Sequence, residues 1–260
     1  MRNNPYVSGA LLGLQQSNNY RGEMWLAISS KVIVVASLAI FWNSIAPNLP
    51  NQDWRQLMVY LLVANGVKEL IDANNIKFAG VMNDEIATGS ISSVLLRPIN
   101  PVLFVFARYT GSRGVQMILG LFFIIAGLVI APQLSVSNFL GFSFSLIISF
   151  LVAYAINTAV GTFAFFVTQA HGLRLVIIHS IRVLGGSTIP LYFFNNKIRQ
   201  ILLLTPLPSL AYLPARMIQV GLTQETIQIS IASFLWVFIL LFISRKLWNL
   251  GLSHYESHGA

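Results

Sequence analysis

The chain has 260 residues, of which 55% are hydrophobic, only 9% are charged and none is cysteine, and its net charge is +8. About a quarter of the residues of a soluble domain are charged, so this composition excludes a soluble globule and predicts an integral membrane protein. The absence of cysteine excludes disulfides, zinc-thiolate sites and a thiol nucleophile. We attribute the positive charge to cytoplasmic loops rather than to nucleic-acid binding.

Six apolar stretches are long enough to span a bilayer, which takes about 20 residues per helix. They are predicted at residues 25–45, 54–76, 114–131, 138–167, 173–194 and 226–243. The preceding residues, 1–24, are too many and too polar for the basic start of a signal peptide, so we expect a cytoplasmic N-terminal segment. The fold is therefore predicted to be a single all-α integral membrane domain over residues 1–260, with six transmembrane helices.

Lysine and arginine predict the orientation of these spans, because such residues concentrate on the cytoplasmic side. With a cytoplasmic N-terminus, the inner segments hold nine of them, which are Arg2, Arg21, Lys77, Arg97, Arg108, Arg113, Arg174, Arg245 and Lys246. The outer segments hold four, which are Arg55, Lys197, Arg199 and Arg216. Both termini, the loop 76–113 and the tail 244–260 are thus expected in the cytoplasm.

Charged residues within the predicted spans are candidates for function. Lys31 lies near the cytoplasmic end of the first span, where its side chain can snorkel to the interface. Lys68 and Asp72 lie four residues apart on one helix face and can pair, with Glu69 beside them. A helix that simply projects past the bilayer would explain these three without a transport role. Arg182 lies deeper, so we expect it to face a neighbouring helix unless the fifth span begins later.

The loop 76–113 contains the stretch GVMNDEIATGSISSVLLRPINP at residues 80–101. The polar run 83–85 suits the start of a helix, and Gly89 then interrupts it. A short helix over the next residues would show one apolar stripe, formed by Ile91, Val94 and Leu95. Arg97 and Pro98 would end it. The sequence predicts a compact element that a soluble partner or the membrane interface could hold.

Residues 185–216 form a second irregular segment, because prolines interrupt helices and its apolar pieces are short. Its breaks are Gly185, Gly186, Pro190, Pro206, Pro208 and Pro214. No full span fits between them. We expect short helices that enter the outer leaflet and return, and that form a re-entrant extracellular cap before the last span.

Residues 85–101 read Glu-Ile-x-x-Gly-x-Ile-x-x-x-Leu-Leu-Arg-Pro-x-x-Pro, a pattern that resembles ABC-type exporter permeases of a bacterial branch. The similarity continues in order through Gly161-Thr-Phe, the run 185–191, the run 205–214 and the tail from Leu247. That tail fits the Trp-x-x-Gly-x-x-x-Tyr ending of the group, although Ser253 and His254 stand where relatives tend to be basic. The resemblance covers nearly the whole chain.

The resemblance implies six spans, an amphipathic N-terminal helix on the inner membrane surface and a cytoplasmic coupling helix between spans two and three. We call residues 85–98 the coupling element, and the residues assigned to it are Glu85, Ile86, Gly89, Ile91, Val94, Leu95, Leu96, Arg97 and Pro98. It would dock on a separate ATPase, present in two copies, that binds ATP and Mg²⁺ itself. Closure of the ATPases would then tilt spans two and five. A second permease, identical or similar, would complete the complex in a bacterial inner membrane.

Enzymatic activity in this chain is not expected. The sequence contains no Gly-Lys-Ser/Thr phosphate loop, so ATP hydrolysis would need the partner. The four histidines lack metal-ligand spacing, and the acidic residues are too scattered for an acid/base pair. Two alternatives remain open at this point. One is a secondary transporter that works without ATP, although no internal repeat is evident. The other is a membrane scaffold for an assembly complex.

Overall fold

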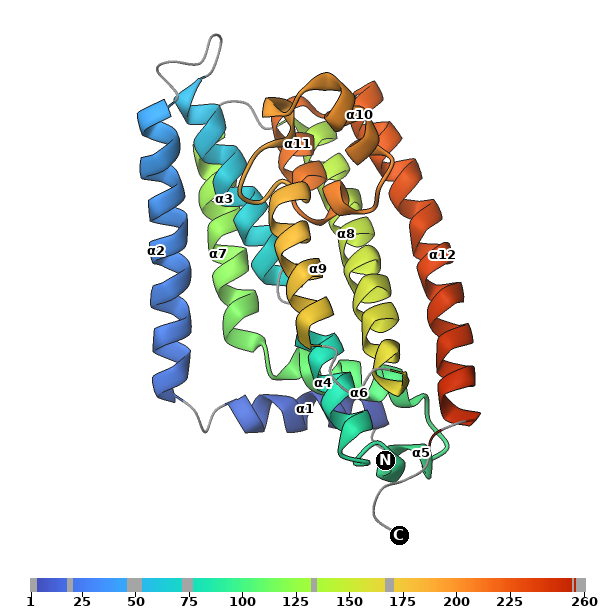
Figure 1. Ribbon diagram of the computed structural model, residues 1–260. Coiled ribbons are helices and arrows are strands. Elements are labelled where there is room, and N and C mark those ends of the chain that lie inside the picture. Colours follow the sequence, from blue (N-terminus) through green and yellow to red (C-terminus); the bar gives the residue numbers. More distant parts are fainter. Residues whose placement is uncertain are drawn as a thin grey trace.

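The computed structural model describes residues 4–17, 21–45, 53–71, 77–131, 135–166, 171–253 and 255. Within these ranges every regular element is a helix, as the composition predicts. The longest helices run side by side as a bundle (Figure 1). They are α2 (Arg21–Ile45), α3 (Trp54–Ile71), α7 (Gly114–Ile130), α8 (Val136–Thr162), α9 (His171–Leu184) and α12 (Gln224–Ser253).

Three of these helices are long and apolar enough to cross a membrane on their own, among the described residues. They are α2, through Ile28–Ile45, α8 and α12. With 27 and 30 residues, α8 and α12 reach roughly 40 and 45 Å at 1.5 Å per residue, beyond the roughly 30 Å of a hydrocarbon core. A fourth span results if α7 is joined to α6 (Pro101–Gly111), although the pair is bent by 67°.

The remaining two predicted spans fall short of that test for physical reasons. Helix α3 carries Arg55, Lys68 and Glu69 within 18 residues, and α9 has only 14 residues before Gly185. The prediction of a fifth span over 173–194 was therefore about ten residues too long, because a turn and a 3-10 helix (Leu191–Phe193) follow α9. The six-span topology stays a prediction.

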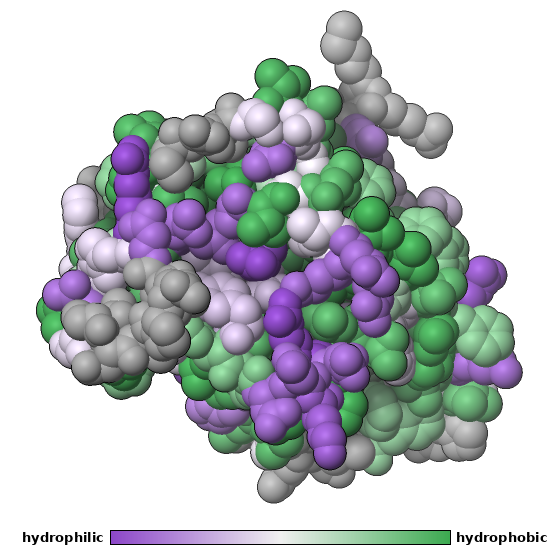
Figure 2. All heavy atoms as spheres, turned by 90° about the horizontal axis from the view of Figure 1, so that it is seen from above, coloured by the Kyte–Doolittle hydropathy of each residue, from purple (hydrophilic) through white to green (hydrophobic). Residues whose placement is uncertain are grey.

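The two ends of the bundle differ in structure. One end, here called the α5 end, carries α1 (Pro5–Ser17), α4 (Lys77–Ala87), α5 (Ser92–Leu95), α6 and the last turns of α12 (Figure 1). The other, the α10 end, carries α10 (Asn196–Leu203), a 3-10 helix (Leu207–Leu210) and α11 (Tyr212–Val220). Figure 2 looks down on the α10 end, where a band of hydrophilic side chains is flanked by apolar ones. The two predicted irregular segments thus lie at opposite ends.

The prolines of the segment 185–216 lie at helix starts, as the reading of short broken helices requires. Pro190 and Pro206 each precede a 3-10 helix, and Pro208 lies in the second one. Pro214 lies in the first turn of α11. Gly186 has a φ of 85°, and a Cβ there would lie 2.8 Å from the hydroxyl oxygen of Tyr60. The segment is folded against α3 rather than extended.

The loop 76–113 is more helical than expected, because residues 101–111 form α6. Pro101 begins this helix, and the side chain of Asn100 accepts a hydrogen bond from the Leu103 amide at 3.1 Å. Helix α1 crosses α6 so closely that a Cβ at Gly111 would overlap the carbonyl of Ala10. The apolar side chains that α1 leaves exposed are Val7, Leu11, Leu12 and Leu14. A helix on the membrane surface presents such a face.

Candidate coupling site

Helix α4 supports the coupling element and is docked on the end of α8. Its side chains Phe78, Met82 and Ile86 are buried in a hydrophobic cluster that is separate from the main core and is here called the second core. The backbone amide of Ala79 donates to the Asn157 side chain of α8 at 3.3 Å. A Cβ at Gly161 would lie 3.0 Å from Met82. The small side chains of α8 thus let α4 approach closely.

The turn after α4 is fixed by polar contacts. Gly89 has a φ of 74°, a conformation that favours glycine. The hydroxyl of Ser90 donates to Glu85 Oε2 at 2.9 Å, and Arg108 of α6 forms an ion pair with Glu85. Glu85 therefore holds the coupling element against α6, and its carboxylate is only partly available to a partner protein.

The predicted apolar stripe faces inward and does not form a free surface. Ile91 and Val94 are buried in the second core, and Leu95 packs against it half-buried. Burial leaves little of this stripe for a partner, because the same side chains anchor α5 to α4 and α6. The large apolar side chain that does project is Leu96, which is 88% exposed. Arg97 and Pro98 beside it are exposed as well.

Arg97 is oriented by an aromatic ring of α6. Its guanidinium carbon lies 5.7 Å from the centre of the Phe104 ring, within the range of a cation–π contact. Leu96, Arg97 and Pro98 thus form a short exposed ridge, one apolar and one cationic side chain followed by a rigid turn, on a base whose apolar side chains are buried. Such a ridge can enter a groove of a partner protein without unfolding.

The C-terminal tail also packs against the second core, through Trp248 and Tyr255. The ring of Phe165, which follows α8, makes edge-to-face contacts with Trp248 and Tyr255, at 5.3 and 5.8 Å between ring centres. A Cβ at Gly251 would overlap the Phe165 ring. The hydroxyl of Tyr255 lies 3.2 Å from that of Ser92 in α5. The tail signature Trp-x-x-Gly-x-x-x-Tyr, whose role is not evident from the sequence, is therefore a clamp around the Phe165 ring.

Charged side chains also meet inside the bundle, between α2 and α3. Lys31 Nζ lies 2.9 Å from Glu69 Oε1, and Lys68 Nζ lies 3.7 Å from the same oxygen. Lys68 donates a hydrogen bond to Asn65 Oδ1 at 2.6 Å. Lys31 is thus paired with Glu69 rather than free to reach the interface. Lys68 and Glu69 are buried, and α3 ends well short of the lower ends of α2 and α12 (Figure 1). Both side chains are therefore packed inside the bundle.

The other two predicted intramembrane charges differ in outcome. Asp72, the expected partner of Lys68, lies outside the described residues. Arg182 is exposed on α9, and its charge acts on Lys68 of α3.

An ion-pair network ties the α10 end together. Glu225, at the start of α12, pairs with Arg199 of α10 and accepts a hydrogen bond from the Tyr212 hydroxyl of α11. Burial raises the pKa of Tyr212 well above its ordinary value, so its hydroxyl keeps its proton and donates. The guanidinium carbon of Arg216 lies 5.3 Å from the Tyr192 ring centre. The network fixes the short helices to the last predicted span.

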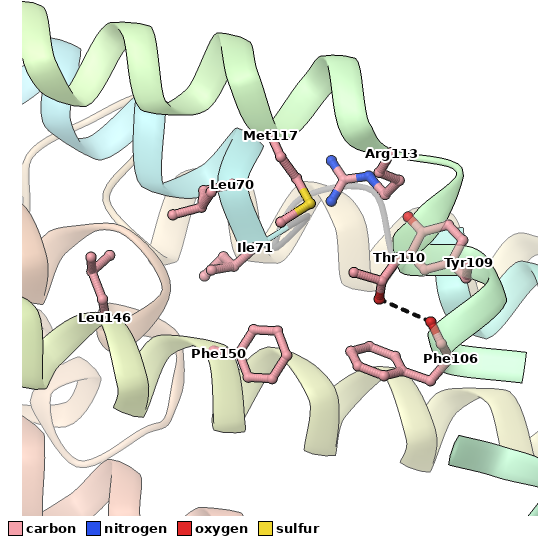
Figure 3. A pocket seen from close by; sticks show the side chains of 9 residues that line it. All are labelled: Leu70, Ile71, Phe106, Tyr109, Thr110, Arg113, Met117, Leu146 and Phe150. Atoms are coloured by element: carbon pink, nitrogen blue, oxygen red, sulfur yellow. Dashed lines mark hydrogen bonds between the residues drawn. The ribbon is translucent and has the colours of Figure 1, made fainter. Parts of the chain in front are cut away.

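A pocket of about 240 Å³ lies between α3, α6, α7 and α8 (Figure 3). Its lining is mostly apolar and consists of Leu70, Ile71, Phe106, Tyr109, Thr110, Arg113, Met117, Leu146 and Phe150. The Thr110 hydroxyl donates to the Phe106 carbonyl at 2.9 Å, and Arg113 donates to the Glu69 carbonyl at 3.0 Å. The mostly apolar lining gives the pocket room for an apolar group. Among the described residues no group of His, Asp or Glu could hold a metal ion.

The comparison with known proteins agrees with this architecture. No curated protein matches the chain significantly. The family model described as ABC-2 family transporter protein matches residues 24–259, nearly the whole length of the chain. The match includes the coupling element, the segment 185–216 and most of the tail. The chain therefore belongs to the ABC-2 family of transporter proteins.

Proposed function

We propose that the chain is the permease subunit of an ATP-driven ABC exporter and that it docks on its ATPase through Leu96, Arg97 and Pro98. The observation that carries this proposal is the 88% exposure of Leu96 on a base whose other large apolar side chains are buried or half-buried. Family membership supports a transport permease that works with an ABC ATPase. The absence of a phosphate loop from the sequence is consistent with ATP and Mg²⁺ being bound by that separate subunit.

The movement of the ATPases would reach the membrane through the second core. The coupling element packs on α4 and α6, α4 packs on α8, and the tail clamp joins α5 to α12. Displacement of Leu96 by the ATPase would therefore displace α8 and α12 directly. This movement would add to the expected tilting of the spans formed by α3 and α9. Packed interiors transmit such displacements because they have low compressibility.

Family membership and surface exposure support the remaining parts of the proposed complex. We place the α5 end in the cytoplasm, since it carries the docking ridge, and the α10 end outside, where its short helices form the re-entrant cap. We infer six spans and a bacterial inner-membrane location. Only 11% of the Ile28–Ile45 window of α2 is buried, which leaves most of this helix for lipid or a second permease. The assembly would contain two ATPases and two permeases, identical or similar. The substrate would be hydrophobic or amphipathic, such as a lipid, a drug or a glycoconjugate.

The experiment is purification of the tagged chain from its native host in mild detergent, with identification of the proteins that accompany it. An ABC ATPase in equal amount supports the proposal, and an additional six-span protein would assign the chain to a heteromeric pore. The Leu96→Glu variant is expected to lose the ATPase, whereas Leu96→Met should retain it. Repeated recovery of the wild-type chain alone would overturn the proposal and favour an ATP-independent transporter or a scaffold.

A further inference from the structure

Charged side chains from four helices, α2, α3, α7 and α9, lie near one another within the bundle. Lys31 of α2 and Lys68 of α3 both lie close to the Glu69 carboxylate, at 2.9 and 3.7 Å. The charge of Arg182, on α9, acts on Lys68 as well. Arg113, at the start of α7, reaches the backbone carbonyl of Glu69 at 3.0 Å. Two lysines therefore contact the Glu69 carboxylate, and two arginines lie nearby, one on the backbone carbonyl of Glu69 and one close enough to act on Lys68.

The charge of this cluster is unbalanced. Asp72 follows Lys68 by four residues in the sequence, and counting it as a second carboxylate still leaves an excess of two positive charges. Lys68 is only 8% exposed and Glu69 only 2%. Buried charges within a membrane are costly unless opposite charges compensate them. A net positive site of this kind attracts and stabilises an anion.

The cluster has an accessible side and a buried floor. The Lys31 side chain is 25% exposed and Arg182 is exposed, whereas Lys68 is buried and donates to Asn65. An anionic group would meet Lys31 and Arg182 first and Lys68 last. Because the remaining surface of α2 and α9 is rich in exposed apolar side chains, an apolar body attached to that anion would have a matching surface.

The floor is held in place by hydrogen bonds to the start of the segment 185–216. Asn65, which orients Lys68, also donates to the Ser187 carbonyl at 3.3 Å. One turn earlier in α3, the Tyr60 hydroxyl donates to the Gly186 carbonyl at 2.6 Å. The position of Lys68 is thus fixed before any ligand arrives, which lowers the entropic cost of binding.

We propose that Lys31, Lys68 and Arg182 bind an anionic group, a phosphate or a carboxylate, of the transported amphiphile. This inference deepens the proposed function and rests on it, since it assigns the substrate class of that exporter. It predicts selection of anionic over zwitterionic amphiphiles of the same apolar body.

The test measures binding to the full-length chain in nanodiscs of phosphatidylcholine. The probes are a fluorescent single-chain phosphate monoester and its phosphocholine analogue, which differ in charge and share the apolar chain. We expect the phosphate monoester to bind at least about tenfold more tightly, as for one charge-assisted contact. Arg182→Gln and Lys31→Gln should each reduce this preference several-fold, whereas Arg182→Lys and Lys31→Arg should retain it. Arg245→Gln, which removes an exposed cation of α12, is the matched control and should leave the preference unchanged.

Equal binding of the two probes, or an unchanged preference in both Gln variants, would overturn the proposal. Inorganic phosphate serves as a competitor: displacement of the anionic probe assigns the site to a free anion, and persistence of the probe assigns it to a head group with its chain. Both results support an anion site. The measurement uses no ATPase, so loss of the proposed exporter function and loss of the anion site are distinguished by separate experiments.

Discussion

The hydroxyl of Tyr255 lies 3.2 Å from the hydroxyl of Ser92, so the end of the chain is joined to the coupling element 163 residues before it. Between them the rings of Phe165, Trp248 and Tyr255 pack edge to face. The last helix and the docking ridge are thus parts of one rigid unit at the α5 end. Movement of one is expected to move the other.

The first prediction concerns this clamp. Phe165→Ala removes the ring that Trp248 and Tyr255 hold, and we expect it to disconnect α12 from the coupling element without loss of the ATPase. The measurement is the labelling rate of a cysteine introduced at exposed Lys246, with and without a non-hydrolysable ATP analogue, in the complex. The sequence has no native cysteine to interfere. The rate should depend on nucleotide with Phe165 present and lose that dependence in Phe165→Ala.

Tyr255→Phe is the milder companion, because it keeps the ring and removes only the contact with Ser92. A single neutral hydrogen bond contributes about 1 kcal/mol, so this variant should retain most of the nucleotide dependence. Equal nucleotide dependence in wild type and Phe165→Ala would show that the clamp does not transmit movement.

The second prediction separates docking from folding within one element. Leu96→Glu changes an exposed side chain, so we expect an unchanged melting temperature and loss of the ATPase on purification. Ile91→Ala removes a fully buried side chain, which costs about 2–5 kcal/mol and should lower the melting temperature. The two measurements are thermal unfolding in detergent and recovery of the ATPase. A Leu96→Glu protein that retains its ATPase would contradict docking through this residue.

This contrast shows how far sequence periodicity reaches. The spacing of Ile91, Val94 and Leu95 correctly indicates one apolar face, but it does not indicate whether that face meets a partner or the protein's own core. What decides is that Val105 of α6 and Met82 of α4 pack against this face. These contacts depend on the tertiary fold and cannot be inferred from the local spacing. The exposed Leu96 lies next to the stripe, at a position that helical periodicity does not mark as a contact residue.

The neighbours of Lys68 likewise depend on tertiary packing more than on local spacing. The i to i+4 spacing of Lys68 and Asp72 predicts a pair that falls outside the described residues, and the described contacts of Lys68 are Glu69 and Asn65. Its tertiary neighbours, Lys31 and Arg182, come from other helices and follow only from the packing of α2, α3 and α9. By contrast, the prolines and glycines of 185–216 predict that segment well, since their effect on the backbone is local.

The third prediction concerns the crossing of α1 and α6. Gly111→Val would force a side chain into the Ala10 carbonyl, and overpacking of this kind costs about 1–3 kcal/mol. We expect the melting temperature to fall by several degrees, at roughly 2–4 °C per kcal/mol for a chain of this size. Gly172→Val is the control, because nothing lies within 4 Å of a Cβ at Gly172. Equal melting temperatures of the two variants would mean that α1 does not pack on α6.

The fourth prediction is a dependence on pH at the α10 end. Burial raises the pKa of Tyr212, so the folded protein holds this proton more tightly than the unfolded chain does. The resulting stability is fully present below the unfolded pKa of about 10 and is lost as the pH rises above it. Thermal unfolding between pH 7 and 11 should therefore show a decline that begins near pH 10.

Two tyrosine variants separate this titration from the hydrogen bond to Glu225. Tyr212→Phe should be less stable by about 1.5–3 kcal/mol at pH 7, the usual contribution of a hydrogen bond to a charged group, and should show a shallower alkaline decline. Tyr192→Phe removes a hydroxyl whose pKa burial raises to about 12, so it should also flatten the decline. Tyr192 donates no hydrogen bond to Glu225 in the network described above. The stability of Tyr192→Phe at pH 7 should therefore stay near that of the wild type. Equal stability of Tyr212→Phe and wild type at pH 7 would show that Glu225 is held by Arg199 alone.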